Sequence, residues 1–287
     1  MWASGAAQAA QFVRIILRFA VSYCGLRRLW LLEQAKILFA EAEENNLGYK
    51  VKNERWKRWR MCSLCEQNYH GFVLCALGWA CWKTYLSRPE TDFARRAAMT
   101  HLGNGLSDAK NDEDALSVLK AELSTERRLG ADEDDLLIVQ NNLAITYQRL
   151  GRFEQAMRMQ RESYSGALKI FGEEHRESLI SAVNYATSLL ALKRFEETKE
   201  LFLKIKPTAQ RVLGQRDKLM MKLRWYYATA LYKDDAATLD DLREAVETLE
   251  AVAPLWKRIF GDAHPDTPRI QGALKDAREA LAARAAA

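Results

Sequence analysis

Apolar residues recur at helical spacing through most of the chain, and the pattern is clearest near its middle. Leu143, Ala144 and Tyr147 fall on one face of a helix with 3.6 residues per turn. Gly151 follows, and a second amphipathic run covers residues 153–171. Because glycine tolerates the left-handed conformation that ends a helix, the pattern predicts two helices joined by a short turn.

This two-helix pattern repeats along the chain. A glycine preceded by Leu or Phe marks each period, at spacings of 42, 42 and 47 residues: Leu129-Gly130, Phe171-Gly172, Leu213-Gly214 and Phe260-Gly261. Five extra residues between 233 and 241 account for the longest spacing, and a less regular copy covers residues 91–130. One helix pair cannot bury its apolar face alone, so the repeats predict a stacked all-α solenoid of antiparallel helix pairs. The half copy from His264 to Ala287 is expected to form a C-terminal capping helix.

Composition and charge divide the chain into two parts. Hydrophobic residues make up 48% of it and charged residues 28%, with only 14 Gly and 5 Pro, which favours packed helices and excludes a disordered or collagen-like chain. Residues 1–90 carry 13 Lys/Arg against 7 Asp/Glu and all five cysteines, whereas residues 91–287 carry 30 against 31. We therefore expect a basic helical head over 1–90 and a repeat domain over 91–287.

The repeat resembles the tetratricopeptide repeat, and within it the kinesin-light-chain type with 42-residue units. The general repeat is matched by the small-residue and aromatic pattern Leu143-Ala144-x2-Tyr147…Gly151…Ala156. The kinesin-light-chain type is matched by the longer period and by the linker Gly261-Asp-Ala-His264-Pro265-Asp-Thr267. We expect His264, and His175 in a weaker copy of this linker, to cap the next helix rather than to catalyse.

The resemblance implies a non-enzymatic scaffold that binds a protein or peptide partner in a concave groove lined by the first helix of each repeat. Asparagine can bond an extended peptide backbone as donor and acceptor, and Trp and Tyr are favoured interface anchors. An alternative is that Asn142 and Asn184 bond only within the solenoid and that Trp225 is partly core. The predicted partner-binding residues are Asn141, Asn142, Ile145, Arg149, Asn184, Thr187, Lys222, Trp225, Thr229 and Tyr232.

The head contains Cys62-x2-Cys65, followed by His70. With its preceding Trp59 and following apolar helix, this pair is similar to the last ligand pair of a RING-CH-type zinc finger. That resemblance implies an alternative function, a ubiquitin-ligase-like protein whose repeats select substrates. A structural zinc needs four ligands, and these residues supply at most three, so the expected metal site is incomplete. We expect a degenerate or truncated finger and no obligatory cofactor, with zinc as the one candidate.

The remaining features concern compartment and other partners. Residues 10–32 are Arg-rich and free of acidic residues, as in a mitochondrial presequence or a membrane-surface helix, but a plain packed or frayed helix is the commoner outcome, so we expect no membrane partner. Residues 50–60 combine six basic residues with two Trp, which could contact nucleic acid, but a solvated helix face is the commoner outcome.

Cysteines confined to the head favour a reducing compartment, so we expect an intracellular, cytoplasmic protein. No nucleotide-binding, HExxH or supported catalytic-triad motif occurs, and we expect no small-molecule substrate.

Overall fold

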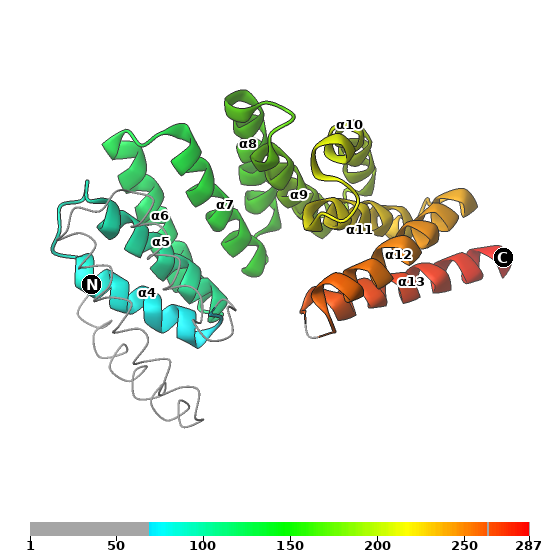
Figure 1. Ribbon diagram of the computed structural model, residues 1–287, viewed down its shortest axis with the longest axis horizontal. Helices are drawn as coiled ribbons and strands as arrows, with labels where there is room; N and C mark the ends of the chain where they lie inside the picture. Colours follow the sequence, from blue (N-terminus) through cyan, green and yellow to red (C-terminus); the bar gives the residue numbers. More distant parts are fainter. Residues whose placement is uncertain (1–68, 263, 287) are drawn as a thin grey trace, which may run out of the picture. The chain divides into compact units, whose positions relative to one another are not determined.

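The structure is a computed structural model that describes residues 69–262 and 264–286. This part of the chain contains ten α-helices and no strand, which confirms the predicted all-α fold (Figure 1). None of these helices is long and apolar enough to cross a membrane. The chain forms two compact units, Met1–Leu129 and Gly130–Ala287. The predicted head and its boundary near residue 90 stay a prediction, because residues 1–68 lie outside the described part.

The described part of the first unit consists of three helices. They are α4 (Phe72–Tyr85), α5 (Phe93–Asp108) and α6 (Asp112–Leu129). The helices α5 and α6 form the predicted irregular first pair, and α4 packs against α5. The backbones of α4 and α5 approach closely at two glycines. A Cβ on Gly78 would lie 2.7 Å from the carbonyl oxygen of His101, and one on Gly105 would lie 2.7 Å from that of Leu74.

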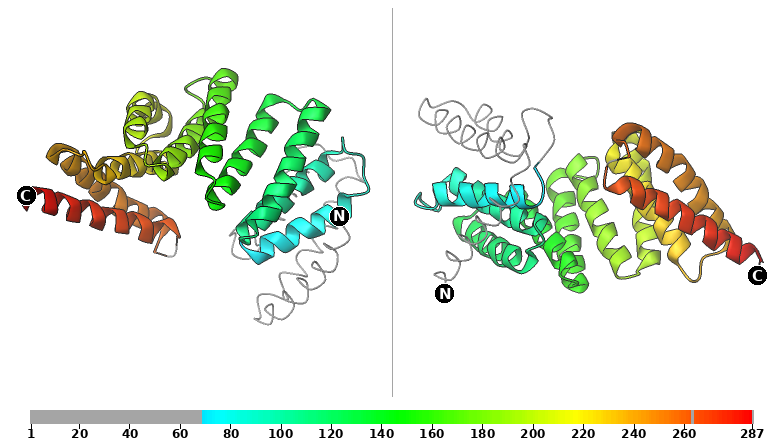
Figure 2. Two further views of the ribbon diagram at one scale, coloured as in Figure 1. Left: turned by 180° about the vertical axis from the view of Figure 1, so that it is seen from behind. Right: turned by 90° about the horizontal axis from the view of Figure 1, so that it is seen from below.

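The second unit contains three helix pairs and a final helix. Each pair packs together, and each packs against the next along the chain. The last helix lies alongside the second helix of the third pair in every view (Figure 2). The helices are α7 (Glu133–Arg149) with α8 (Phe153–Phe171), α9 (Arg176–Ala191) with α10 (Phe195–Leu213), α11 (Lys218–Lys233) with α12 (Leu239–Phe260), and α13 (Asp266–Ala286).

Small and large side chains share the core of the second unit as the repeat predicts. Ala144 and Ala156, which occupy the close approach between α7 and α8, are both fully buried. Trp256 and Leu249 on α12 are also fully buried, and Ile270 of α13 packs into the same hydrophobic cluster. Burial of Ile270 means that α13 covers the end of this core, which confirms its predicted role as a cap.

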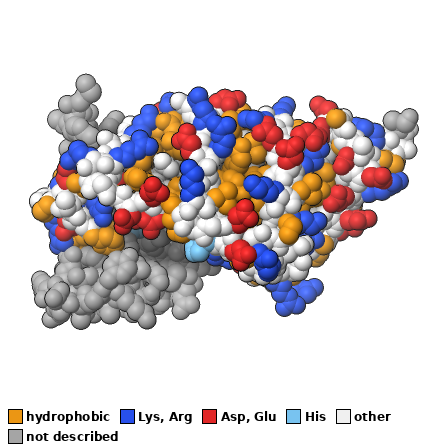
Figure 3. Space-filling view, turned by 90° about the horizontal axis from the view of Figure 1, so that it is seen from above, with side chains coloured by type: hydrophobic (Ala, Val, Ile, Leu, Met, Phe, Trp, Pro, Cys, Tyr) orange, Lys and Arg blue, Asp and Glu red, His pale blue; other side chains and the backbone are white. Residues whose placement is uncertain are grey.

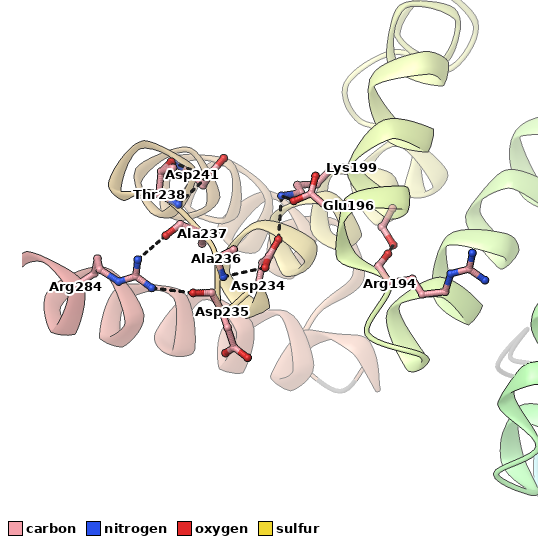
Figure 4. Close-up of polar contacts among 11 residues, drawn as sticks. Arg194, Glu196, Lys199, Asp234, Asp235, Ala236, Ala237, Thr238, Asp241 and Arg284 are labelled. Carbon is pink, nitrogen blue, oxygen red and sulfur yellow. Dashed lines mark hydrogen bonds and ion pairs between the residues drawn. The ribbon is translucent and has the colours of Figure 1, made fainter.

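The five extra residues of the third pair form the turn between α11 and α12, and both neighbouring helices hold it (Figure 4). The guanidinium group of Arg284 on α13 donates to the carbonyl oxygens of Ala237 at 2.7 Å and Asp235 at 3.2 Å. On the other side, Lys199 Nζ of α10 donates to Asp234 Oδ2 at 3.1 Å. Thr238 then begins α12 with a capping box. The insertion is therefore a fixed structural link between α10 and the cap.

Both linker histidines cap the next helix, as expected. Nδ1 of His175 accepts a hydrogen bond from the backbone N–H of Glu177 at 3.2 Å, and Nδ1 of His264 accepts from that of Asp266 at 3.1 Å. The linker between α10 and α11 uses Asp217 at the equivalent position. These contacts satisfy backbone donors that a helix start would otherwise leave unpaired.

Candidate interaction surface

The first helices of the repeats lie next to one another in the second unit. The helix α7 contacts α9, α9 contacts α11, and α11 contacts α13. We call the adjoining faces of these four helices the inner surface. Each predicted partner-binding residue lies on α7, α9 or α11. Repeat register therefore places these residues on neighbouring elements, although not all at one site.

The part of the inner surface on α7 and α9 carries a network of amide side chains. Oδ1 of Asn141 accepts from Nδ2 of Asn184 at 2.8 Å and from Nε2 of Gln160 at 3.0 Å. Nε2 of Gln148 donates to the hydroxyl of Ser188 at 2.7 Å. The predicted alternative is that Asn142 and Asn184 bond only within the solenoid, and the contact with Asn141 supports it for one donor of Asn184. These contacts leave the donors of Asn141 and the acceptor of Asn184 for other partners.

A pocket of about 430 Å³ lies further along the inner surface, between α9, α11 and α13. We call it the α9–α11–α13 pocket. Four predicted partner-binding residues line it: Thr187, Trp225, Thr229 and Tyr232. Its other lining residues are Leu190, Ala191, Phe195, Tyr226, Lys233, Arg269, Gly272, Ala273 and Asp276. Aromatic rings and aliphatic groups dominate this list, as in pockets that hold an anchoring side chain.

The aromatic side of the pocket is rigid and uncharged. The Trp225 side chain is only 7% exposed, and the Tyr226 ring lies 5.1 Å from its ring. Burial, with a contribution from the Asp266 carboxylate, raises the pKa of Tyr226 to about 12. Burial and the Asp276 carboxylate raise the pKa of Tyr232 to about 12. Both phenols therefore keep their protons at neutral pH and remain hydrogen-bond donors.

Three charged groups beside the pocket are paired with one another. The Asp266 carboxylate lies 3.4 Å from Lys222 Nζ and 3.3 Å from the Arg269 guanidinium. That guanidinium also lies over the Trp225 ring, 6.0 Å from its centroid. Lys233 Nζ lies 5.9 Å from the centroid of the Tyr232 ring. Basic and acidic side chains are likewise interspersed over the face of the molecule shown in Figure 3.

Some predicted residues lie on the inner surface but away from the pocket. Ile145, Asn142 and Arg149 belong to α7, and Lys222 is held by its ion pair with Asp266. Their role in binding stays a prediction.

Sequence reasoning missed the wall of the pocket that α13 provides. Advancing the groove positions Lys222, Trp225, Tyr226 and Thr229 by the last period of 47 residues gives Arg269, Gly272, Ala273 and Asp276. All four line the pocket. The signal was present in the sequence, because register alone identifies these positions once the cap is treated as a half repeat.

The predicted zinc site lies mostly outside the described residues and stays a prediction. Cys62 and Cys65 lie outside them. The His70 side chain is 77% exposed, and its Nδ1 lies 3.9 Å from an Asp108 carboxylate oxygen. No group of three or more His, Cys, Asp or Glu side chains that could hold a metal ion occurs within residues 69–262 and 264–286.

Comparison with known proteins agrees with the repeat architecture. The family model of the tetratricopeptide repeat matches residues 95–169, which span the first repeat and much of the second. No curated protein matches the chain by sequence.

Two solved structures share the fold at low sequence identity. BtubC (BKLC) from P. vanneervenii is 16% identical, with a TM-score of 0.52 over 73% of this chain and 90% of that one. A kinesin light chain from Podosopora anserina with nearly identical TPR-like repeats is 18% identical, with a TM-score of 0.52 over 80% and 96% of the two chains. Residues 95–169 therefore match the tetratricopeptide repeat, and the chain shares the fold of the kinesin-light-chain-like repeats.

Proposed function

We propose that the chain is a non-enzymatic protein-interaction scaffold that binds a partner peptide or partner helix on its inner surface. The observation that carries this proposal is the α9–α11–α13 pocket, which combines aromatic walls with the hydroxyl groups of Thr187 and Thr229. Tetratricopeptide repeats are a protein-interaction fold, which also supports the proposal. The buried free thiol of Cys75 is consistent with a reducing, intracellular compartment.

The test must block the pocket without damaging the core. Truncating Trp225 is unsuitable, because this side chain is 7% exposed and its removal would cost about 3–5 kcal/mol of stability. Thr229 is better, because it is half-buried and its hydroxyl bonds to the Trp225 carbonyl of its own helix and to the Tyr232 side chain of the same pocket. An arginine there is expected to project into the pocket. Gln210→Arg on the exposed side of α10 is the matched control.

The experiment is selection of a random peptide phage library on the full chain, followed by affinity measurement of the enriched peptides. We expect wild type and Gln210→Arg to bind the same peptides, and Thr229→Arg to bind them at least about tenfold more weakly. The proposal fails if wild type enriches no peptide, or if Thr229→Arg binds the peptides as well as wild type does.

A further inference from the structure

Gly272 differs from the other helix-interior glycines that the structure describes. Gly78, Gly103, Gly105 and Gly166 each have a neighbouring atom within 3.1 Å of where a Cβ would lie, so close packing accounts for them. Gly272 has no atom within 4 Å of that point, and it lines the α9–α11–α13 pocket. Packing therefore does not require a glycine at this position.

Backbone conformation does not require it either. Gly272 lies seven residues inside α13, and its φ is not positive. A glycine in a helix interior costs about 0.5–1 kcal/mol relative to alanine. What this glycine does provide is open space next to the rings of the pocket.

The equivalent residues in the other repeats show how large a side chain this helix position can carry. The equivalent position holds Asn141 on α7, Val183 on α9 and Trp225 on α11. Only in α13 is the side chain missing, and there it faces the lining formed by Trp225, Tyr226 and Thr229. A branched or aromatic side chain at 272 would occupy volume that is now empty.

The residues that line the pocket indicate which kind of side chain it can bind. Four aromatic rings line the pocket: those of Phe195, Trp225, Tyr226 and Tyr232. Aromatic side chains pack well against one another through offset and edge contacts. The charged residues that line the pocket, Lys233, Arg269 and Asp276, are all exposed to solvent. The buried Asp266 carboxylate beside the pocket is paired with Lys222 and Arg269. The interior of the pocket therefore favours a large uncharged aromatic group over a charged one.

We propose that the α9–α11–α13 pocket accepts one large aromatic side chain of the partner, and that Gly272 determines which anchor fits. This inference rests on the proposed function, and it deepens it by assigning the anchoring chemistry and a specificity-determining position. It predicts that filling the space at 272 blocks the anchor while the solenoid stays folded.

The probe is N-acetyl-4-fluorophenylalanine amide, an uncharged aromatic side chain on a blocked backbone. Its binding to the full chain is followed by the broadening of its ¹⁹F resonance, with N-acetyl-3-fluoroalanine amide as the comparison compound. Gly272→Leu fills the pocket. Gly272→Ala adds only a methyl group in open space, and Gln271→Leu places the same leucine on the exposed neighbouring position.

We expect wild type, Gly272→Ala and Gln271→Leu to bind the aromatic probe alike, and Gly272→Leu to bind it at least about tenfold more weakly. All three substitutions remove no buried group, and a circular-dichroism melt confirms that each variant is folded. Equal binding by Gly272→Leu, no binding by wild type, or equal binding of the alanine analogue would overturn the inference.

The phage-selected peptides separate this outcome from the proposed function. Peptides that bind wild type and Gly272→Leu equally, but not Thr229→Arg, would retain the scaffold and reject the aromatic anchor. A chain that enriches no peptide would reject the scaffold itself.

Discussion

At the scale of single residues, the buried Glu122 and the capping His264 are expected to make the stability of the fold depend on pH in opposite directions. Glu122 of α6 is 2% exposed, and its Oε1 accepts a hydrogen bond from the Thr100 hydroxyl of α5. Its Oε2 has no hydrogen-bond partner. Burial, and to a smaller extent the neighbouring Glu126, raises the pKa of Glu122 from 4.5 to about 7. The folded first unit therefore favours the protonated form of this carboxyl.

Glu122→Gln is expected to remove a pH-dependent loss of stability. Because the folded pKa is above the unfolded one, the contribution of Glu122 is fully present below about pH 4.5 and is lost as the pH rises through 7. At pH 8 the variant should be more stable than wild type by about 1–3 kcal/mol, because glutamine stays neutral. Urea unfolding at pH 5 and pH 8 measures this difference.

Glu126→Gln is the matched control on the same helix. Glu126 Oε2 lies 2.6 Å from the Arg96 guanidinium, so this change should destabilise the unit at neutral pH by breaking an ion pair. A Glu122→Gln variant that is less stable than wild type at pH 8 would show that the buried carboxylate is stabilised by contacts other than those described.

His264 should give the opposite response in the second unit. Its Nδ1 accepts from a backbone N–H, and its Nε2 lies 3.2 Å from Lys218 Nζ. Burial, together with Lys218 and Lys222, lowers the pKa of His264 below 6.5, and Asp266 opposes them. The stability that the neutral ring contributes is therefore present above about pH 6.5 and is lost as the pH falls through the folded pKa.

His264→Asn is expected to flatten this dependence, because asparagine caps a helix well and does not titrate in this range. Thermal unfolding between pH 5 and pH 7.5 compares the two proteins. An unchanged slope in the variant would mean that another group carries the acid sensitivity.

At the scale of elements, the turn between α7 and α8 and the turn between α9 and α10 share one geometry but not one residue. Gly151 ends the first helix of its pair with a φ of 72°, and Lys193 occupies the equivalent position with a φ of 57°. Their backbone N–H groups donate to the equivalent carbonyls of Gln148 and Leu190, both at 3.0 Å. The left-handed conformation costs lysine about 1–2 kcal/mol relative to glycine.

Lys193→Gly should therefore stabilise the second unit, and Gly151→Ala should destabilise it. Part of the gain is offset because glycine adds entropy to the unfolded chain, so we expect about 0.5–1 kcal/mol in each direction. Both sites are exposed, and urea unfolding compares them in the same unit. Stabilisation by both changes, or by neither, would contradict the backbone account.

At the scale of the whole molecule, the repeat period predicts the helix pairs well. The residues that end and cap each helix and the small residues that pack between helices follow the same period. The glycine that ends each second helix, the small residues between helices and the capping histidines recur in register, so one period defines all of them. The predicted second helix over 153–171 matches α8.

Register also places the first helices of the repeats next to one another, but it does not predict how their side chains pair. The bond between Asn141 and Asn184 depends on the stacking of α7 against α9, which spacing along one helix does not specify. The burial of Trp225 depends on the cap in the same way. The wall of the pocket formed by Arg269, Gly272 and Asp276 was missed, because the last helix was expected only to cover the end of the core and not to line a binding site.

The most direct test of the central claim is hydrogen–deuterium exchange of the full chain with and without a phage-selected peptide. If the inner surface binds the partner, protection should increase on α9, α11 and α13, whose residues line the pocket. The exposed sides of α8, α10 and α12 should not change. Protection confined to α8, α10 and α12 would contradict the account and assign partner binding to the opposite helices of the repeats.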